Sequence, residues 1–223
     1  MSEATSDRPG PVAPEHLLAE KRRILTAALP DVPFDGWTQR LLVQAAQTAG
    51  FDAAMAARAF PGGTRDLLDF FMRETDRRML EALAAQAIGP DKVRERIAGA
   101  IRLRLEGEIL HREAIRKALA AMALPPNVPL ALKGLYRTID AIWYAAGDHA
   151  TDLNFYTKRL TLAGVYAATL TCWLDDTSEG QAQTWTFLDR RLNDVMSIGR
   201  LKKRLGGLGK NFPDPRHLLK IRL

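Results

Sequence analysis

The stretch WTQRLLVQAAQTAGFDAAMAARAFPGGTRDLL, residues 37–68, decides the fold class of this 223-residue chain. Apolar residues recur at helical spacing over 38–48, and Gly50 then lies in a tight turn. A short alanine-rich helix follows over 52–59. Because helix, glycine turn and short helix make up the helix-turn-helix pattern, we predict a three-helix unit over residues 15–62.

Helical periodicity continues outside this stretch, and alternating strand patterns are nearly absent. Proline clusters at 30–33 and 124–129 mark breaks between helices. The predicted helices span roughly 15–29, 38–48, 52–59, 64–86, 91–109, 111–123, 127–146, 152–174 and 179–205. We predict an all-α fold with an N-terminal helix-turn-helix unit and a C-terminal helical bundle over residues 63–193. A disordered segment over residues 1–14 and an arm over 194–223 are expected at the two ends.

Composition limits the class of protein. Apolar residues make up 47% and charged residues 26% of the chain, as in ordinary globular domains. The single cysteine, Cys172, excludes an internal disulfide and a cysteine-built zinc site, and we interpret it as a packed apolar residue. The first 20 residues resemble neither a secretory signal nor a transit peptide. The longest uncharged apolar stretch, 160–174, has 15 residues and predicts a buried helix, since a membrane span needs about 20.

Few residues suggest chemistry. Glu108 and His111 have the E-x-x-H spacing of di-iron bundles, but such sites need a second copy and further carboxylates, so a solvated helix-end histidine is the preferred interpretation. The acidic turn at 175–179 is expected to end one helix and cap the next. We find no Ser-His-Asp arrangement, Walker loop or Rossmann fingerprint. We therefore predict no catalytic residue, no metal site and no cofactor, with an unrecognised helical enzyme as an alternative.

The helix over 160–174 is apolar around its whole circumference, so other helices must surround it. Small residues alternate with large ones along it, and a second apolar stripe follows over 185–195. Such a pair of helices is compatible with a cavity for an apolar ligand, but periodicity alone favours plain core or dimer packing. The predicted lipid-binding residues are Leu162, Val165, Tyr166, Leu170, Trp173, Trp185, Leu188 and Leu192.

The positive charge is concentrated at the C-terminal end. Residues 190–223 hold ten Lys/Arg and two Asp, a net +8 within a chain of net +6. An apolar line with basic residues on the other faces is typical of a helix that lies in an anionic membrane interface. The predicted membrane-binding residues are Ile198, Leu201, Lys202, Lys203 and Leu205. A solvated basic helix end is the alternative.

The aromatic residue and glycine turn at 60–64, followed by Asp66-Leu-Leu68, resemble the end of the DNA-binding unit in TetR-family regulators. Base recognition would need Arg, Lys, Asn or Gln near the start of the helix over 52–59. That helix carries one base, Arg58, against one acid, Asp52. We predict a TetR-like fold that does not bind DNA, and keep a TetR-type ligand-responsive regulator as the alternative function.

Two motifs resemble the ubiquinone-biosynthesis accessory family known as the ninth Coq protein. One is the run DAIWYAAGDHATDLNFYTKR over 140–159, and the other is TWTFLDRRLND over 184–194. With the TetR-like front end, the resemblance covers roughly residues 15–200.

The resemblance implies a non-catalytic, homodimeric protein with a TetR-like fold that binds isoprenoid quinone precursors. It implies that the lipid is presented to the di-iron demethoxyubiquinone hydroxylase at an anionic membrane surface. The partner-binding positions carried over are Asp152, Phe155, Tyr156 and Arg159, with Phe155 where the family pattern has a tryptophan. The expected location is cytoplasmic, peripheral on the inner face of a bacterial inner membrane.

Overall fold

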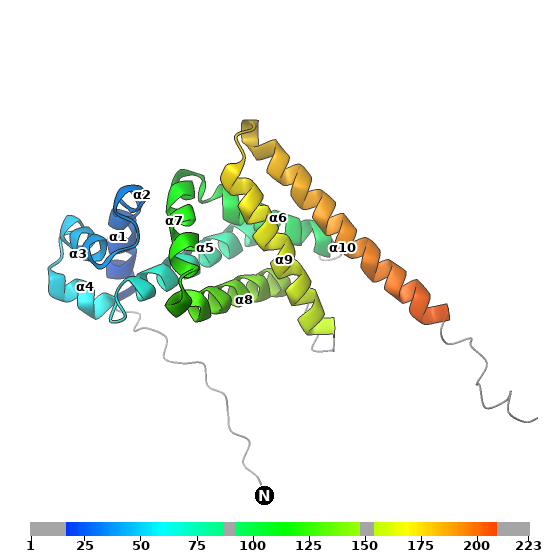
Figure 1. The fold of residues 1–223 in the computed structure, drawn as a ribbon, viewed down its shortest axis with the longest axis horizontal. Helices are drawn as coiled ribbons and strands as arrows, with labels where there is room; N and C mark the ends of the chain where they lie inside the picture. The colour runs from blue at the N-terminus through cyan, green and yellow to red at the C-terminus, as the bar shows by residue number, and fades with distance from the viewer. Residues whose placement is uncertain (1–16, 87–91, 148–153, 209–223) are drawn as a thin grey trace, which may run out of the picture.

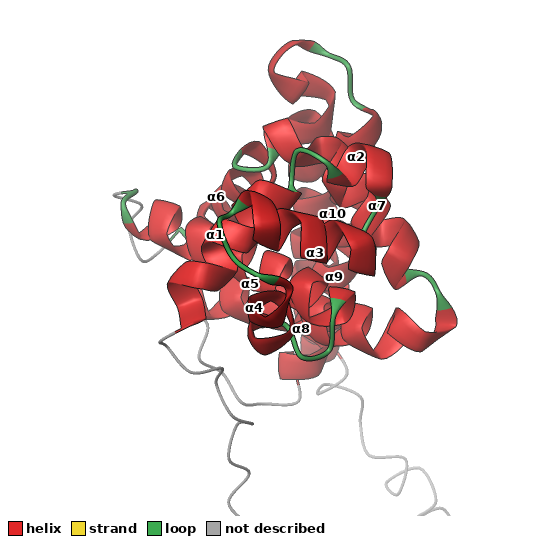
Figure 2. Cartoon of the chain, turned by 90° about the vertical axis from the view of Figure 1, so that its left-hand side faces the viewer, coloured by secondary structure: helices red, strands yellow, loops and turns green. Residues whose placement is uncertain are grey.

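The computed structural model describes residues 17–86, 92–147 and 154–208, with side chains described up to residue 195. Over these ranges the chain forms α-helices, short 3-10 turns and loops, and no strand (Figure 2). The all-α prediction is confirmed. The first four helices gather at one end of the molecule, and the long C-terminal helix runs along the opposite end (Figure 1).

The helix-turn-helix unit consists of α1 (Leu18–Ala28), α3 (Gln39–Thr48) and α4 (Ala53–Ala59). Helix α3 begins at a cap in which Thr38 accepts a hydrogen bond from the Leu41 amide at 3.2 Å. Asp52 caps α4 in the same way, accepting from the Met55 amide at 2.7 Å. Between them Gly50 has a φ of 81°, a left-handed conformation that favours glycine. The predicted motif is therefore present, with α3 and α4 each beginning one residue later than predicted.

A short helix that the sequence did not predict, α2 (Val32–Asp35), follows α1. Pro33 was interpreted as part of a break. In the structure Pro33 lies in the first turn of α2, where a missing amide hydrogen costs nothing. The prolines therefore start a helix here instead of only ending one.

The remaining helices build one bundle. The long linking helix α5 (Thr64–Ala84) is followed, among the described residues, by α6 (Val93–Glu106), α7 (Arg112–Met122), α8 (Val128–Ala145), α9 (Asn154–Asp175) and α10 (Ala182–Leu208). Helix α5 packs against α6 and α8, α8 packs against α9, and α9 packs against α10. No helix in the described part of the chain has the length and apolar character needed to cross a membrane.

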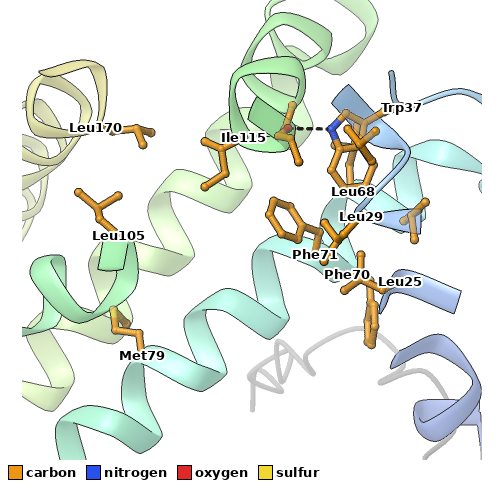
Figure 3. Packing of buried hydrophobic residues seen from close by; sticks show 14 of the residues in the cluster. Leu25, Leu29, Trp37, Leu68, Phe70, Phe71, Met79, Leu105, Ile115 and Leu170 are labelled. Atoms are coloured by element: carbon orange, nitrogen blue, oxygen red, sulfur yellow. Dashed lines mark hydrogen bonds between the residues drawn. The ribbon is translucent and has the colours of Figure 1, made fainter. Parts of the chain in front are cut away.

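A continuous apolar core joins the helix-turn-helix unit to the bundle (Figure 3). The Trp37 ring lies 5.2 Å from the Phe71 ring of α5, centroid to centroid. The indole nitrogen of Trp37 also donates a hydrogen bond to the Ala114 carbonyl oxygen of α7 at 3.1 Å. Burial of this aromatic pair contributes several kcal/mol of hydrophobic stabilisation, at roughly 1.5–3 kcal/mol per large side chain.

Two arginines of α7 hold the end of α9. Arg116 donates to the Leu174 carbonyl oxygen at 2.7 Å, and Arg112 donates to the Asp176 carbonyl oxygen, also at 2.7 Å. The Arg112 guanidinium lies 4.8 Å from the Trp173 ring centre. Carbonyl oxygens at the end of a helix lack intrahelical partners and carry partial negative charge, so cations are favourable there. These contacts fix the spacing between α7 and α9.

Candidate functional site

An apolar cavity of about 310 Å³ lies between α5, α6, α7, α8 and α9. This volume is at the lower end of the range for small-molecule sites. Its walls are mostly alanine, methionine and aliphatic side chains, with a few polar residues. The lining residues are Phe71, Met72, Thr75, Arg104, Ile115, Ala118, Leu119, Met122, Ala123, Ala131, Gly134, Leu135, Thr138, Tyr166, Ala167 and Leu170. Figure 3 shows Ile115 and Leu170 on facing helices.

The cavity has an open end and a closed end. Ala123 and Ala167 are exposed, so they mark the mouth between α7, α8 and α9. Leu124, Val128 and Leu132, which follow in the chain, are exposed apolar residues. The lining residues Thr75, Arg104, Thr138 and Tyr166 are buried and form the floor. The lining of the cavity therefore includes exposed alanines at its mouth and a cluster of buried polar groups.

The floor is built around an ion pair. Nε of Arg104 donates to Asp76 at 2.9 Å, and Nη1 of Arg104 donates to the Tyr166 hydroxyl at 2.6 Å. The Thr138 hydroxyl also donates to Asp76, at 2.9 Å, and the Arg137 guanidinium lies 3.4 Å from the same carboxylate. Burial raises the pKa of Tyr166 above its ordinary value, so its hydroxyl keeps its proton near neutral pH.

At the wall of the cavity between α5 and α8, Gly134 lies close to Met72. A Cβ atom at Gly134 would lie 2.7 Å from the sulfur of Met72, so any side chain there would displace Met72 within the cavity wall. Methionine is flexible and fills irregular space well. The pair Gly134 and Met72 thus sets how closely α8 approaches α5.

The cavity differs in position from the predicted lipid-binding set. Of the eight residues, only Tyr166 and Leu170 line it. The others of α9, namely Leu162, Val165 and Trp173, are buried in the core. The α10 residues Leu188 and Leu192 are also buried in the core, and Trp185 packs against it. The expected closure by α10 is therefore not what the structure has: none of its described residues lines the cavity, which lies instead between α9 and α7/α8.

Helix α10 is tied to α6. Arg94 donates to Asp189 at 3.0 Å, and the Arg102 guanidinium lies 5.0 Å from the Trp185 ring centre. The predicted membrane-binding residues lie on the last turns of this helix, but their side chains fall outside the described residues: Ile198, Leu201, Lys202, Lys203 and Leu205. Their predicted role stays a prediction.

The four predicted partner-binding positions separate into different environments. Tyr156 is 73% exposed near the start of α9. Arg159 is buried, and its side chain donates to Asp140 of α8 at 2.8 Å. Asp152 and the side chain of Phe155 fall outside the described residues. The ion pair of Arg159 with Asp140 links α8 to α9, and the partner-binding role of the four positions stays a prediction.

The Glu108 and His111 pair differs in part from its interpretation. Glu108 is 1% exposed, and Arg78 lies 2.5 Å from its carboxylate. His111 is 3.1 Å from Glu108, and Thr75 donates to the same carboxylate at 3.3 Å. His111 is therefore a half-buried histidine at the start of α7, as its helix-end interpretation expects, but it contacts a buried carboxylate and is not fully solvated. No cluster of potential metal ligands occurs among the described residues.

The acidic turn after α9 has the predicted capping role. Asp176 accepts hydrogen bonds from the Ser178 amide and the Thr184 amide, each at 2.8 Å. It also accepts from both hydroxyls, at 2.5 Å from Ser178 and 2.6 Å from Thr184. Burial acts to raise the pKa of Asp176, but these hydrogen bonds outweigh it and hold the pKa well below its ordinary value. Cys172 lies 3.9 Å from the Thr184 hydroxyl at the same corner.

The arrangement of helices is shared with a solved regulator. The "TetR transcriptional regulator from Nitrosomonas europaea ATCC 19718" superposes with a TM-score of 0.64 at 23% identity, covering 78% of this chain and 97% of that one. At that identity the likeness shows the fold alone. The fold and the site therefore define a TetR-like, all-helical protein that has an apolar chamber in its C-terminal bundle.

Sequence comparisons define the family. The COQ9 family profile matches residues 128–199. "Ubiquinone biosynthesis protein COQ9, mitochondrial" of Rattus norvegicus is 34% identical over 197 residues, which is 85% of this chain and 63% of that protein. COQ9-B of Xenopus laevis is 32% identical over 197 residues, covering 85% of this chain and 67% of the relative. The chain belongs to the COQ9 family, and it spans just under two thirds of the length of the rat relative.

Proposed function

We propose that this chain is a non-catalytic lipid-binding accessory protein of ubiquinone biosynthesis. In this proposal it holds part of an isoprenoid quinone precursor in the cavity and presents the lipid to the demethoxyubiquinone hydroxylase. The observation that carries the proposal is the apolar cavity with its mouth between α7, α8 and α9. The names of the relatives support a role in ubiquinone biosynthesis, and they specify no reaction.

The size of the cavity decides how such a lipid is held. At roughly 30 Å³ for each water-sized group, the cavity accommodates on the order of ten non-hydrogen atoms. That is room for a substituted quinone ring or for about two isoprene units, and not for a long tail as well. Each CH₂ group left in water costs about 0.8 kcal/mol. A long prenyl tail must therefore stay in the bilayer while one end of the molecule enters the protein.

A lipid whose tail stays in the bilayer is reached only from the membrane surface, so in this proposal the protein works there. The net charge of +8 over residues 190–223 favours an anionic membrane, with each basic residue near such a surface contributing about 1 kcal/mol. We place the protein peripherally on the membrane that holds the quinone precursor. The curated relatives are named as mitochondrial proteins, and the inner face of a bacterial inner membrane is our proposal for this chain.

The hydroxylase and a second copy of the chain are the proposed protein partners. Tyr156 supports a docking role because a tyrosine with 73% of its surface exposed offers a large, rigid contact at low entropic cost. A regulator of transcription is less well supported, because α4 carries a single base and begins at an acid, Asp52. A gel shift at low salt separates the two functions.

Native mass spectrometry of gently purified protein tests the proposed function. We expect a mass increment that extraction and chromatography identify as an isoprenoid quinone or its precursor. Protein that carries only phospholipid, or that is empty after expression in cells that make the precursor, would contradict the proposal.

A further inference from the structure

The floor of the cavity carries a hydroxyl group, that of Tyr166, which is free to donate its own proton in a hydrogen bond. The Tyr166 hydroxyl accepts from Arg104 at 2.6 Å, and among the described residues no acceptor is within hydrogen-bond distance of its own proton. Tyr166 is only 5% exposed, and it lines the cavity. A buried hydroxyl that donates to nothing costs free energy unless a ligand supplies the acceptor.

The charges at the floor select among possible acceptors. Arg104 is neutralised by Asp76, which lies 2.9 Å away, and a second buried carboxylate, Glu108, accepts from Thr75 of the floor. A carboxylate entering here would find no unpaired cation among the described residues of the floor, because Arg104 and Arg137 both pair with Asp76 and Arg78 pairs with Glu108. A cation would face Arg104. A neutral oxygen, such as a quinone carbonyl or a phenol, meets neither penalty.

From this geometry we infer that the cavity takes the oxygen-bearing ring of a neutral amphipathic lipid first, with the Tyr166 hydroxyl donating to a ring oxygen and the apolar tail leaving through the mouth. The inference rests on the proposed function and adds the orientation of the ligand to it. The tail then passes Ala123 and Ala167, the exposed residues of the cavity lining. Presentation to a partner is release of the ring through the same mouth.

The Tyr166→Phe variant tests the orientation because it keeps the ring packing and removes the hydroxyl. Three probes are compared by displacement of a fluorescent apolar dye: a quinone with a two-isoprene tail, an oxygen-free hydrocarbon of the same length, and a fatty acid of the same length. We expect Tyr166→Phe to weaken quinone binding about fivefold, the value of one hydrogen bond, and to leave hydrocarbon binding unchanged. Tyr136→Phe, an exposed tyrosine outside the cavity, is the matched control and should bind all probes as wild type does.

The outcomes separate the two proposals. Wild-type protein that binds no probe contradicts the proposed function itself. Quinone binding that Tyr166→Phe leaves unchanged, or a fatty acid that binds more tightly than the quinone, overturns only the inference about the floor. Infrared spectra of the quinone on wild-type protein give an independent test that does not depend on how the variant folds. A carbonyl stretch lowered from its value in hydrocarbon solvent supports the hydrogen bond, and an unshifted stretch overturns it.

Discussion

The indole nitrogen of Trp37 donates a hydrogen bond to the Ala114 carbonyl oxygen at 3.1 Å, joining the entrance of the helix-turn-helix unit to α7. Helix α7 is also a wall of the cavity and the anchor of α9. The N-terminal unit therefore helps to hold α7, one wall of the cavity, in place, which is a structural role.

We expect Trp37→Phe to lower the free energy of unfolding by about 1–3 kcal/mol, because a buried hydrogen bond is lost and the smaller ring fills less of the core. Chemical denaturation followed by circular dichroism measures the change. The matched control is Trp185→Phe, whose lost hydrogen bond to Gly180 lies at an exposed position and should cost less. Equal losses of unfolding free energy in the two variants would show that the hydrogen bond from Trp37 to α7 contributes no more than an exposed one.

The lowered pKa of Asp176 leads us to expect a particular pH dependence of stability. Its pKa is below the ordinary value of 3.8, so its contribution to stability is complete above about pH 4 and is lost as the pH falls toward the folded-state pKa. We expect Asp176→Asn to be less stable than wild type by about 1.5–3 kcal/mol at pH 7, and to lose less stability than wild type below pH 4. Asp175→Asn, an exposed neighbour, should keep the wild-type pH profile. If the free energy of unfolding of Asp176→Asn falls below pH 4 as steeply as that of wild type, then Asp176 does not cause the acid dependence.

Tyr156→Ala is expected to weaken binding to the hydroxylase by about thirtyfold, as truncation of an interface hot spot of ~2 kcal/mol does. Surface plasmon resonance with the purified partner gives the affinity. Tyr136→Ala removes another exposed tyrosine, on α8, and should bind as wild type does. If both variants bind equally well, the docking surface lies elsewhere.

The double variant Lys202→Ala/Lys203→Ala should reduce binding to anionic vesicles by about thirtyfold, since two charges near the surface contribute about 2 kcal/mol together. Vesicle sedimentation at several salt concentrations measures this, and binding to neutral vesicles should change little. Removal of residues 194–223 should have a larger effect than the double variant. Anionic-vesicle binding that survives the truncation would place the membrane contact on another surface.

The elements of the fold could be predicted because their signals are local. Gly50 ends one helix and Asp52 caps the next within a few residues, so the helix-turn-helix unit follows from the sequence. Pro33 was misinterpreted because proline suits the first turn of a helix as well as a break. Helix boundaries elsewhere agree to within a few residues for the same reason.

The position of the cavity could not be predicted, because it depends on which helices face one another. Arg104 and Thr75 look like solvated residues in the sequence, and only the long-range contacts with Asp76, Glu108 and Tyr166 bury them. The stretch 160–174 of α9 is uncharged on all sides, so its periodicity gave no direction for the cavity. The prediction that other helices surround it is wrong, because Leu160, Ala167 and Ala168 are exposed. Arg159 illustrates the same point, since its partner Asp140 lies on another helix.

Lipid occupancy in a matched pair of neighbouring variants tests the central claim that this cavity holds the lipid. Ala167 lines the mouth and Ala168, the next residue of α9, does not, while both are exposed. Native mass spectrometry of Ala167→Trp, Ala168→Trp and wild type, purified side by side, gives the bound fraction. We predict that Ala167→Trp loses most of its isoprenoid lipid while Ala168→Trp retains the wild-type amount. Equal occupancy in the two variants would contradict the account.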